Sequence, residues 1–161
     1  MIVEVSVQRA LTGHKNLSMP DDNQIEHWAE QAVLMSRHRH NEKLLMSVRI
    51  VEESEITDLN RTYRGKNKAT NVLSFPFDIP PGLPAEESEG ELGDVIVCAS
   101  VVEQEAREQH KTSEAHWAHM IIHGTLHLLG YDHETEAEAQ QMESLEKAVM
   151  HELGYTDPYR D

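Results

Sequence analysis

The chain has 161 residues and a formal net charge of −15 at pH 7, a length that suits one domain, residues 1–161, because no change in composition marks a second. The excess of acid argues against nonspecific binding to nucleic acid, which relies on clustered lysine and arginine. Because Cys98 is the single cysteine, an internal disulfide is excluded. Cys98 is predicted to be a small core residue, which fits a protein of the reducing cytoplasm. No stretch is apolar and long enough to cross a membrane.

The N-terminal part predicts two strands and two helices. Residues 2–8 alternate apolar and polar side chains, which is typical of a half-buried strand and not of a signal peptide. A helix is predicted from about Asp22 to Arg39, because apolar residues recur at helical spacing over Ile25–Val33, and a second strand follows over Leu44–Val51. A short helix is predicted over Glu53–Tyr63.

A basic loop and an acidic loop flank the third predicted strand. Gly65 opens the basic loop, which ends at Asn71. This loop and the end of the preceding helix together contain no acid and four cations: Arg61, Arg64, Lys66 and Lys68. Such a basic run is most often a solvated loop. Val72–Phe77 predicts a strand that lies at a sheet edge or is ended by its proline, Pro76. Residues 78–91, rich in proline and glutamate, predict an exposed loop and the best candidate for local disorder.

The C-terminal part predicts one more strand and three helices. Leu92–Cys98 is the strand, Val101–His110 a helix, and Ser113–Leu129 a long apolar helix. Residues 135–138 have the form of a capping box, and the last helix that they begin ends near Leu153. Strands and helices do not alternate regularly, so the predicted fold class is α+β: a single domain with a mixed sheet of about four strands covered by helices.

Three histidines have the spacing of a metal site on the long helix and the turn after it. His123 and His127 lie four residues apart on one helix face, and Gly130 lets the chain turn and return His133 to them. Three imidazoles favour zinc with one position for water, while nickel, cobalt or iron stay open. Because the chain has eleven histidines, chance spacing and hydrogen-bonded core histidines are the competing explanation. His119, one helical step earlier, is interpreted as a core residue or a support for a ligand.

Gly124 separates this motif from that of a zinc peptidase. Peptidases built on His-Glu-x-x-His have their general-base glutamate at this position, which makes a metallopeptidase a weaker alternative. A glycine inside a helix costs about 1 kcal/mol relative to alanine. It therefore indicates either room for a substrate or close packing of the helix. His110 and His116 are interpreted as surface or capping residues.

Two long segments of the chain resemble one known family. Residues 123–133, HGTLHLLGYDH, are similar to the signature of the YbeY family of bacterial metal-dependent endoribonucleases. Residues 59–77, LNRTYRGKNKATNVLSFPF, resemble the second conserved block of that family. Shorter matches at 92–97 and 153–155 extend the resemblance over about residues 44–159.

The resemblance implies a single α+β domain in which His123, His127 and His133 hold one zinc ion. It implies a single-strand-specific endoribonuclease that acts in maturation of the 3′ end of 16S ribosomal RNA and in ribosome quality control. The implied partners are ribosomal RNA and components of the small ribosomal subunit in the cytoplasm, with no membrane and no DNA expected. The resemblance also implies that Arg64 is essential.

The chemistry that suits these residues is metal-assisted cleavage of a phosphodiester. Zinc lowers the pKa of a bound water to about 7 or holds a phosphate oxygen, and the planar guanidinium of Arg64 offsets charge that develops on the phosphoryl group. Asp94 and Asp132 are candidates to orient a ligand or handle a proton. The RNA backbone on either side of the cleaved phosphodiester would contact the other cations of the basic run: Arg61, Lys66 and Lys68.

A noncatalytic ribosome-assembly factor with a structural zinc is the main alternative to the enzyme. Structural zinc sites are normally closed by four protein ligands, whereas the motif supplies three. The sequence therefore favours catalysis, unless a distant histidine supplies a fourth ligand.

Overall fold

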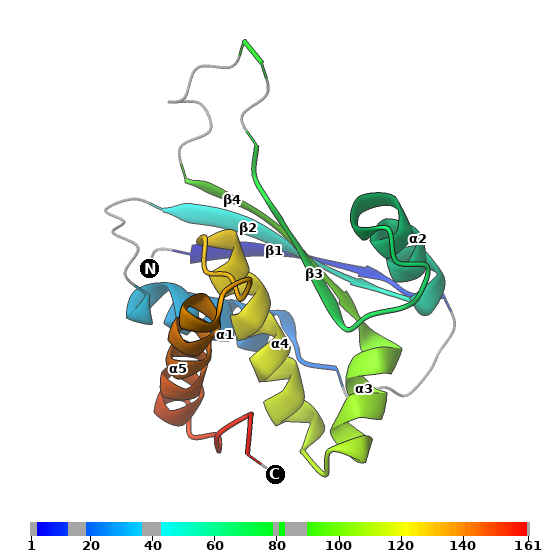
Figure 1. The fold of residues 1–161 in the computed structure, drawn as a ribbon. Helices are drawn as coiled ribbons and strands as arrows, with labels where there is room; N and C mark the ends of the chain where they lie inside the picture. Colours follow the sequence, from blue (N-terminus) through cyan, green and yellow to red (C-terminus); the bar gives the residue numbers. More distant parts are fainter. Residues whose placement is uncertain (1–2, 13–18, 37–42, 79–80, 83–89, 161) are drawn as a thin grey trace.

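A computed structural model describes residues 3–12, 19–36, 43–78, 81–82 and 90–160. In this part of the chain four strands form one sheet: β1 (Val3–Ala10), β2 (Leu44–Val51), β3 (Val72–Pro76) and β4 (Glu91–Cys98). Five helices pack around it: α1 (Asp22–Met35), α2 (Glu53–Arg64), α3 (Ala99–Glu108), α4 (Ser113–Leu128) and α5 (Glu136–Glu152). Figure 1 shows α1, α4 and α5 grouped together and α2 apart from them, beyond the sheet. The predicted α+β fold is confirmed.

The sheet is mixed, with the strand order β1-β2-β4-β3. β1, β2 and β4 are parallel to one another, and β3 runs antiparallel to β4 at the edge. Pro76, which has no N–H to donate to a neighbouring strand, is the last residue of β3. The structure thus confirms that this strand lies at an edge and also that it ends at its proline.

Alternate residues of β4 face two apolar clusters on opposite sides of the sheet. Val95 and Val97 belong to the larger cluster, which includes residues of α1, α4 and α5, whereas Ile96 and Cys98 belong to a smaller cluster with Ile56 of α2. Cys98 is fully buried, as predicted for a small core residue. Because β3 is the edge strand, the segment after α2 can pass this edge and reach the side on which α4 lies.

Gly124 lets α4 lie directly against the sheet. A Cβ atom at this position would be 2.7 Å from Val95 Cγ1, closer than side chains pack. The carbonyl oxygen of Gly124 also accepts a hydrogen bond from Ser74 Oγ of β3, at 3.0 Å. Close packing is therefore the reason for the glycine, and the interpretation that it makes room for a substrate is wrong. The same contact brings the neighbouring His123 close to β3.

Helices α1 and α3 differ from the prediction at their ends. α1 ends at Met35 and not near Arg39, because Ser36 is extended (φ −77°, ψ 168°) while its N–H bonds to carbonyls of the last turn; residues 37–39 lie outside the described residues. α3 begins at Ala99, directly after β4 and two residues earlier than predicted. No helix in the described ranges combines the length and apolar character that a membrane span requires.

The connection between β3 and β4 is described only at its two ends. Asp78 and Gly82 are exposed, and Glu91, which was predicted to end the loop, is the first residue of β4. The predicted local disorder depends on residues 79–80 and 83–89, which lie outside the described residues.

Candidate metal centre

The end of α4 and the turn after it bring three histidines together. Gly130 has a left-handed backbone conformation (φ +100°) that reverses the chain. The N–H groups of Gly130 and Tyr131 donate to carbonyls of the last helical turn at 3.0 and 3.1 Å, a pair of bonds that closes many helices. Because the turn is held in this way, His133 returns to the face that carries His123 and His127.

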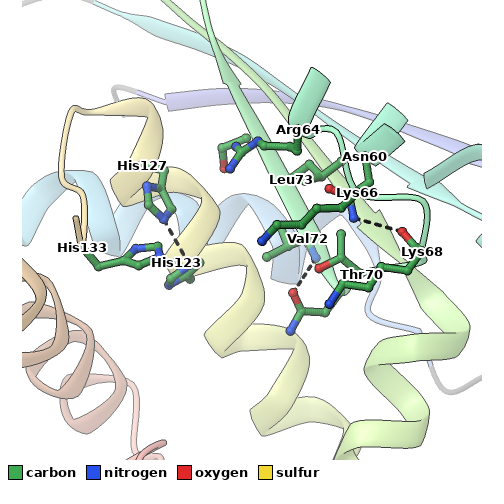
Figure 2. Close-up of a pocket in the computed structure, with 12 residues that line it drawn as sticks. Asn60, Arg64, Lys66, Lys68, Thr70, Val72, Leu73, His123, His127 and His133 are labelled. Atoms are coloured by element: carbon green, nitrogen blue, oxygen red, sulfur yellow. Dashed lines mark hydrogen bonds between the residues drawn. The ribbon is translucent and has the colours of Figure 1, made fainter. Parts of the chain in front are cut away.

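The three side chains have the spacing of a metal site. One nitrogen from each of His123, His127 and His133 lies within 4.8 Å of the other two, and Figure 2 shows the three rings gathered at one end of a cavity. The Nε2 atoms of His123 and His127 are 3.2 Å apart, close to the roughly 3.3 Å that zinc–nitrogen bonds of about 2.0–2.1 Å give in a tetrahedron. The side chain of His133 is 59% exposed, so the group opens to solvent. These residues fit a zinc ion.

A buried carboxylate on α5 supports the histidines from behind. Glu146 is fully buried and accepts hydrogen bonds from His119 Nε2 at 2.5 Å, His123 Nδ1 at 3.1 Å and the Tyr159 hydroxyl at 2.8 Å. Burial alone would raise its pKa, but the bonds from the two histidines outweigh burial and lower the pKa of Glu146 to about 2. Glu146 is therefore an ionised carboxylate at neutral pH.

This carboxylate decides which nitrogen of His123 carries the proton. An ionised carboxylate only accepts hydrogen bonds, so Nδ1 of His123 must donate and its Nε2 carries the lone pair, which faces Nε2 of His127 at 3.2 Å. Burial, followed by the nearby charges of His123 and His133, lowers the pKa of His127 to about 4. His127 is neutral at pH 7, which is the form that binds a metal.

Two further histidines of α4 are core residues. His119 is 7% exposed and bonded to Glu146, which confirms its interpretation as a core or supporting residue; burial lowers its pKa. The surface interpretation of His116 is wrong, because it is 3% exposed and its Nε2 lies 2.9 Å from a carboxylate oxygen of Glu105 on α3. His110 is exposed as predicted.

The basic loop borders the same site. A cavity of about 270 Å³ has the three histidines at one end, and Figure 2 shows the cations on its other side, with further walls from β3. α2 ends at Arg64, Gly65 turns the chain in the left-handed region (φ +69°), and Asn60 Nδ2 donates to Lys68 O at 2.9 Å to hold the loop. The cations that line the cavity are Arg64, Lys66 and Lys68.

Arg61 points elsewhere. Its guanidinium donates to Asp58 at 2.8 Å on the exposed side of α2 and lies 3.5 Å from Asn67 Oδ1, and it does not line the cavity. The structure therefore brings together three of the four predicted cations.

The two candidate aspartates lie in different places. Asp132 Oδ1 accepts from the backbone N–H of His133 at 2.8 Å and lies 3.8 Å from Nδ1 of the same residue. Asp94 precedes Val95, which faces α4, so Asp94 faces the opposite side of the sheet, where it bonds to Ser47. A direct role for Asp94 beside the histidines is therefore wrong.

Sequence reasoning did not select Glu146 or Tyr159. A signal for Glu146 exists, because this acid occupies the apolar face of α5, between Met142 and Val149, which are both buried. An acidic residue on an otherwise apolar helical face indicates a buried partner. Tyr159 has no comparable signal, because it lies in an irregular segment after the last helix.

Comparisons with known proteins show the family and the fold of the chain. A family model described as Endoribonuclease YbeY matches residues 12–154. Among solved structures, the chain is similar to the solution structure of TM1509 from Thermotoga maritima, with a TM-score of 0.53 and 24% sequence identity over 98% of this chain and 100% of that chain. At that identity the structural similarity concerns the fold alone. The family match covers most of the sequence, and the chain belongs to the YbeY family of endoribonucleases.

Proposed function

We propose that this protein is a zinc-dependent endoribonuclease that cuts single-stranded RNA, matures the 3′ end of 16S ribosomal RNA and serves ribosome quality control. One observation carries the proposal: a metal-type group of three histidines and three cations line one cavity. Histidine nitrogens suit zinc, and cations suit the phosphates of RNA.

His123, His127 and His133 would hold one zinc ion per chain. When bound, zinc supplies Lewis-acid chemistry, which polarises a phosphoryl oxygen and lowers the pKa of water to about 7. Glu146 holds the proton on Nδ1 of His123, so that its Nε2 stays available as a ligand.

The cations act on the substrate. Arg64 lines the same cavity on the side opposite the histidines (Figure 2), where its planar guanidinium can donate two hydrogen bonds to a phosphate and offset the charge that develops during cleavage. Lys66 and Lys68 lie farther along the loop and would hold the neighbouring backbone. Arg61, exposed and paired with Asp58, would contact RNA only farther from the cut.

The acidic balance of the whole chain shapes how RNA binds. With a net charge of −15 and few cations at the cavity, we infer weak and salt-sensitive binding of free RNA. Components of the small ribosomal subunit would then present the RNA, in the cytoplasm.

Two alternatives are less well supported. A metallopeptidase of the His-Glu-x-x-His type needs a carboxylate where this chain has Gly124, and that position packs against Val95. A structural zinc needs a fourth protein ligand, and within the described residues the clustered group consists of three histidines.

The test uses purified protein of measured metal content and its His123→Ala variant. Both are incubated with small-subunit precursor RNA and with assembled ribosomal particles, and the ends of the products are mapped. We expect metal-dependent cuts in single-stranded RNA by the parental protein and none by the variant. Equal products from both proteins would show that the histidine site does not cut RNA. Binding to particles without any cut would support the assembly factor instead.

A further inference from the structure

A second hollow meets the histidines from the side of α5. Its volume is about 340 Å³, and it shares His123 and His133 with the basic cavity. The rest of its wall comes from α5 and the segment after it: Ala139, Met142, Glu143, Glu146 and Tyr159. Figure 1 shows α5 and β3 on either side of α4, so the two hollows approach the same imidazoles from different directions.

The two hollows differ in charge. Three cations line the basic cavity, whereas the second hollow is lined by two carboxylates, Glu143 and Glu146, and by no lysine or arginine. A phosphate would be repelled there. The remaining wall is apolar or aromatic, which suits an uncharged flat group.

Tyr159 gives this hollow a fixed aromatic wall. The side chain is 43% exposed, its hydroxyl donates to Glu146 at 2.8 Å, and its ring packs edge-on against His119 with centroids 5.3 Å apart. The ring is thus held in place and part of it stays accessible, with Lys147 Nζ 6.0 Å from its centroid, so a base that stacks on the face over which Lys147 lies would displace this ammonium. Bases of single-stranded RNA stack on aromatic side chains placed in this way.

Glu143 supplies a polar edge beside that wall. It lies on α5 one residue after Met142, is half-buried and is close enough for its charge to act on Tyr159. A carboxylate only accepts hydrogen bonds, so it favours a base whose pairing edge carries donors. Guanine presents two neighbouring donors, N1–H and the N2 amine, whereas uracil presents only N3–H.

We propose that this hollow is a nucleobase subsite, in which a base next to the cut phosphate stacks on Tyr159 and donates to Glu143, with guanine preferred over uracil. The subsite rests on the proposed ribonuclease function, because it is the shared histidines that place the base next to a phosphate in the basic cavity. It also gives a reason for single-strand specificity, since a base within a duplex is stacked and its pairing edge is occupied.

The test uses the full-length, zinc-loaded protein and mononucleotides, which contain no internucleotide bond to cut. Guanosine 5′-monophosphate and uridine 5′-monophosphate carry the same phosphate, so any difference between them reports the base. Ring-proton resonances of Tyr159, assigned with a Tyr159→Phe variant, are followed by NMR during each titration. We expect guanosine monophosphate to shift these resonances and to bind on the order of tenfold more tightly than uridine monophosphate.

Variants separate stacking from edge recognition. Tyr159→Ala should weaken binding of guanosine monophosphate on the order of tenfold at unchanged zinc content, whereas Tyr159→Phe, which keeps the ring, should retain it. Glu143→Gln should reduce the preference for guanine. Glu152→Gln removes the same charge from an exposed position of the same helix and should change neither affinity.

Each outcome decides the subsite separately from the nuclease. Unshifted Tyr159 resonances, or equal affinity for both nucleotides, would overturn the subsite even if the protein cuts RNA. Shifted resonances with a guanine preference that depends on Glu143 would establish it even if the separate cleavage assay with precursor RNA is negative, a result that would overturn only the nuclease.

Discussion

The two helices that approach the histidines contribute opposite chemistry. α2 and its loop supply exposed cations that line a cavity, whereas α5 supplies Glu146, a fully buried carboxylate bonded to three side chains. An exposed cation can bind a substrate directly, but a buried carboxylate acts only through the protein groups it contacts. From this difference we infer that substrate binding and ligand orientation fall to separate parts of the chain, so variants on the two sides should have separable effects.

The largest effect is expected from a change in the histidine group, which both sides approach. His127→Ala deletes one of the three clustered nitrogens, so we expect loss of zinc and a fall in RNA cleavage larger than the roughly 10- to 100-fold typical of supporting residues. Metal analysis and end mapping measure both. His110→Ala, at an exposed position away from the group, is the control and should retain both. If His127→Ala cleaves RNA at the parental rate, the histidine group is not the centre on which the two sides act.

The cation side is tested with Arg64→Ala. We expect kcat/KM for RNA to fall by about 10²- to 10³-fold, because a donor to the developing charge is lost, while zinc content stays the same. Arg61→Ala, which removes a cation outside the cavity, is the matched control and should have a much smaller effect. If Arg64→Ala loses its zinc, the two sides are not separable.

The carboxylate side is tested with Glu146→Gln. The amide keeps the shape but cannot accept from every donor that now reaches the carboxylate, so we expect zinc affinity to fall roughly 10- to 100-fold. Competition with a chelator measures this, and Glu152→Gln serves as the exposed control. Unchanged zinc affinity together with slower cleavage would place Glu146 on the substrate side instead.

The helix between the two sides is tested with Gly124→Ala. The added Cβ would lie 2.7 Å from Val95, so α4 must shift from the sheet. Overpacking costs about 1–3 kcal/mol and the better helix propensity of alanine returns about 1, which leaves a net loss of unfolding free energy of about 0–2 kcal/mol. Urea unfolding measures it, and a more stable variant would show that the contact does not constrain α4.

The smallest expected effect is a pH dependence on the carboxylate side. The pKa of Glu146 is lowered to about 2 in the folded protein, so its contribution to stability is present above its unfolded pKa of about 4.3 and is lost as pH falls toward 2. The lowered pKa of His119 acts in the same direction below pH 6.5. Between pH 5 and 3, the unfolding free energy of the metal-free parental protein should therefore fall by on the order of 1 kcal/mol more than that of Glu146→Gln. Urea unfolding at the two pH values measures this difference.

Local patterns in the sequence predicted the elements well. The strand Leu44–Val51 has the predicted bounds, and the capping box at Thr135 forms as expected, with Glu138 accepting in return. Such features depend on residues close in sequence. α1 was predicted too long because no glycine or proline near Ser36 marks an end in the sequence, whereas the backbone leaves the helix at this residue.

Long-range relations were harder to predict. The three histidines lie within one local segment, so spacing alone could group them, whereas Glu146 reaches them from another helix. Pro76 indicated that β3 could lie at a sheet edge, but not that this edge lies beside α4, where the cavity around Arg64 forms, because strand order cannot be read from periodicity. The pair of Asp58 and Arg61 is local by contrast, because the two residues lie three apart on α2, and their spacing could have indicated that Arg61 turns toward Asp58.

The turn at Gly130 has a consequence for the order of folding. Because His123, His127 and His133 are joined by one helical turn and its closure, gathering them requires a short loop and little loss of chain entropy. The cavity requires Arg64 to meet residues far along the chain, which costs more entropy. We therefore expect a nascent or partly unfolded chain to gain affinity for zinc before it gains affinity for RNA.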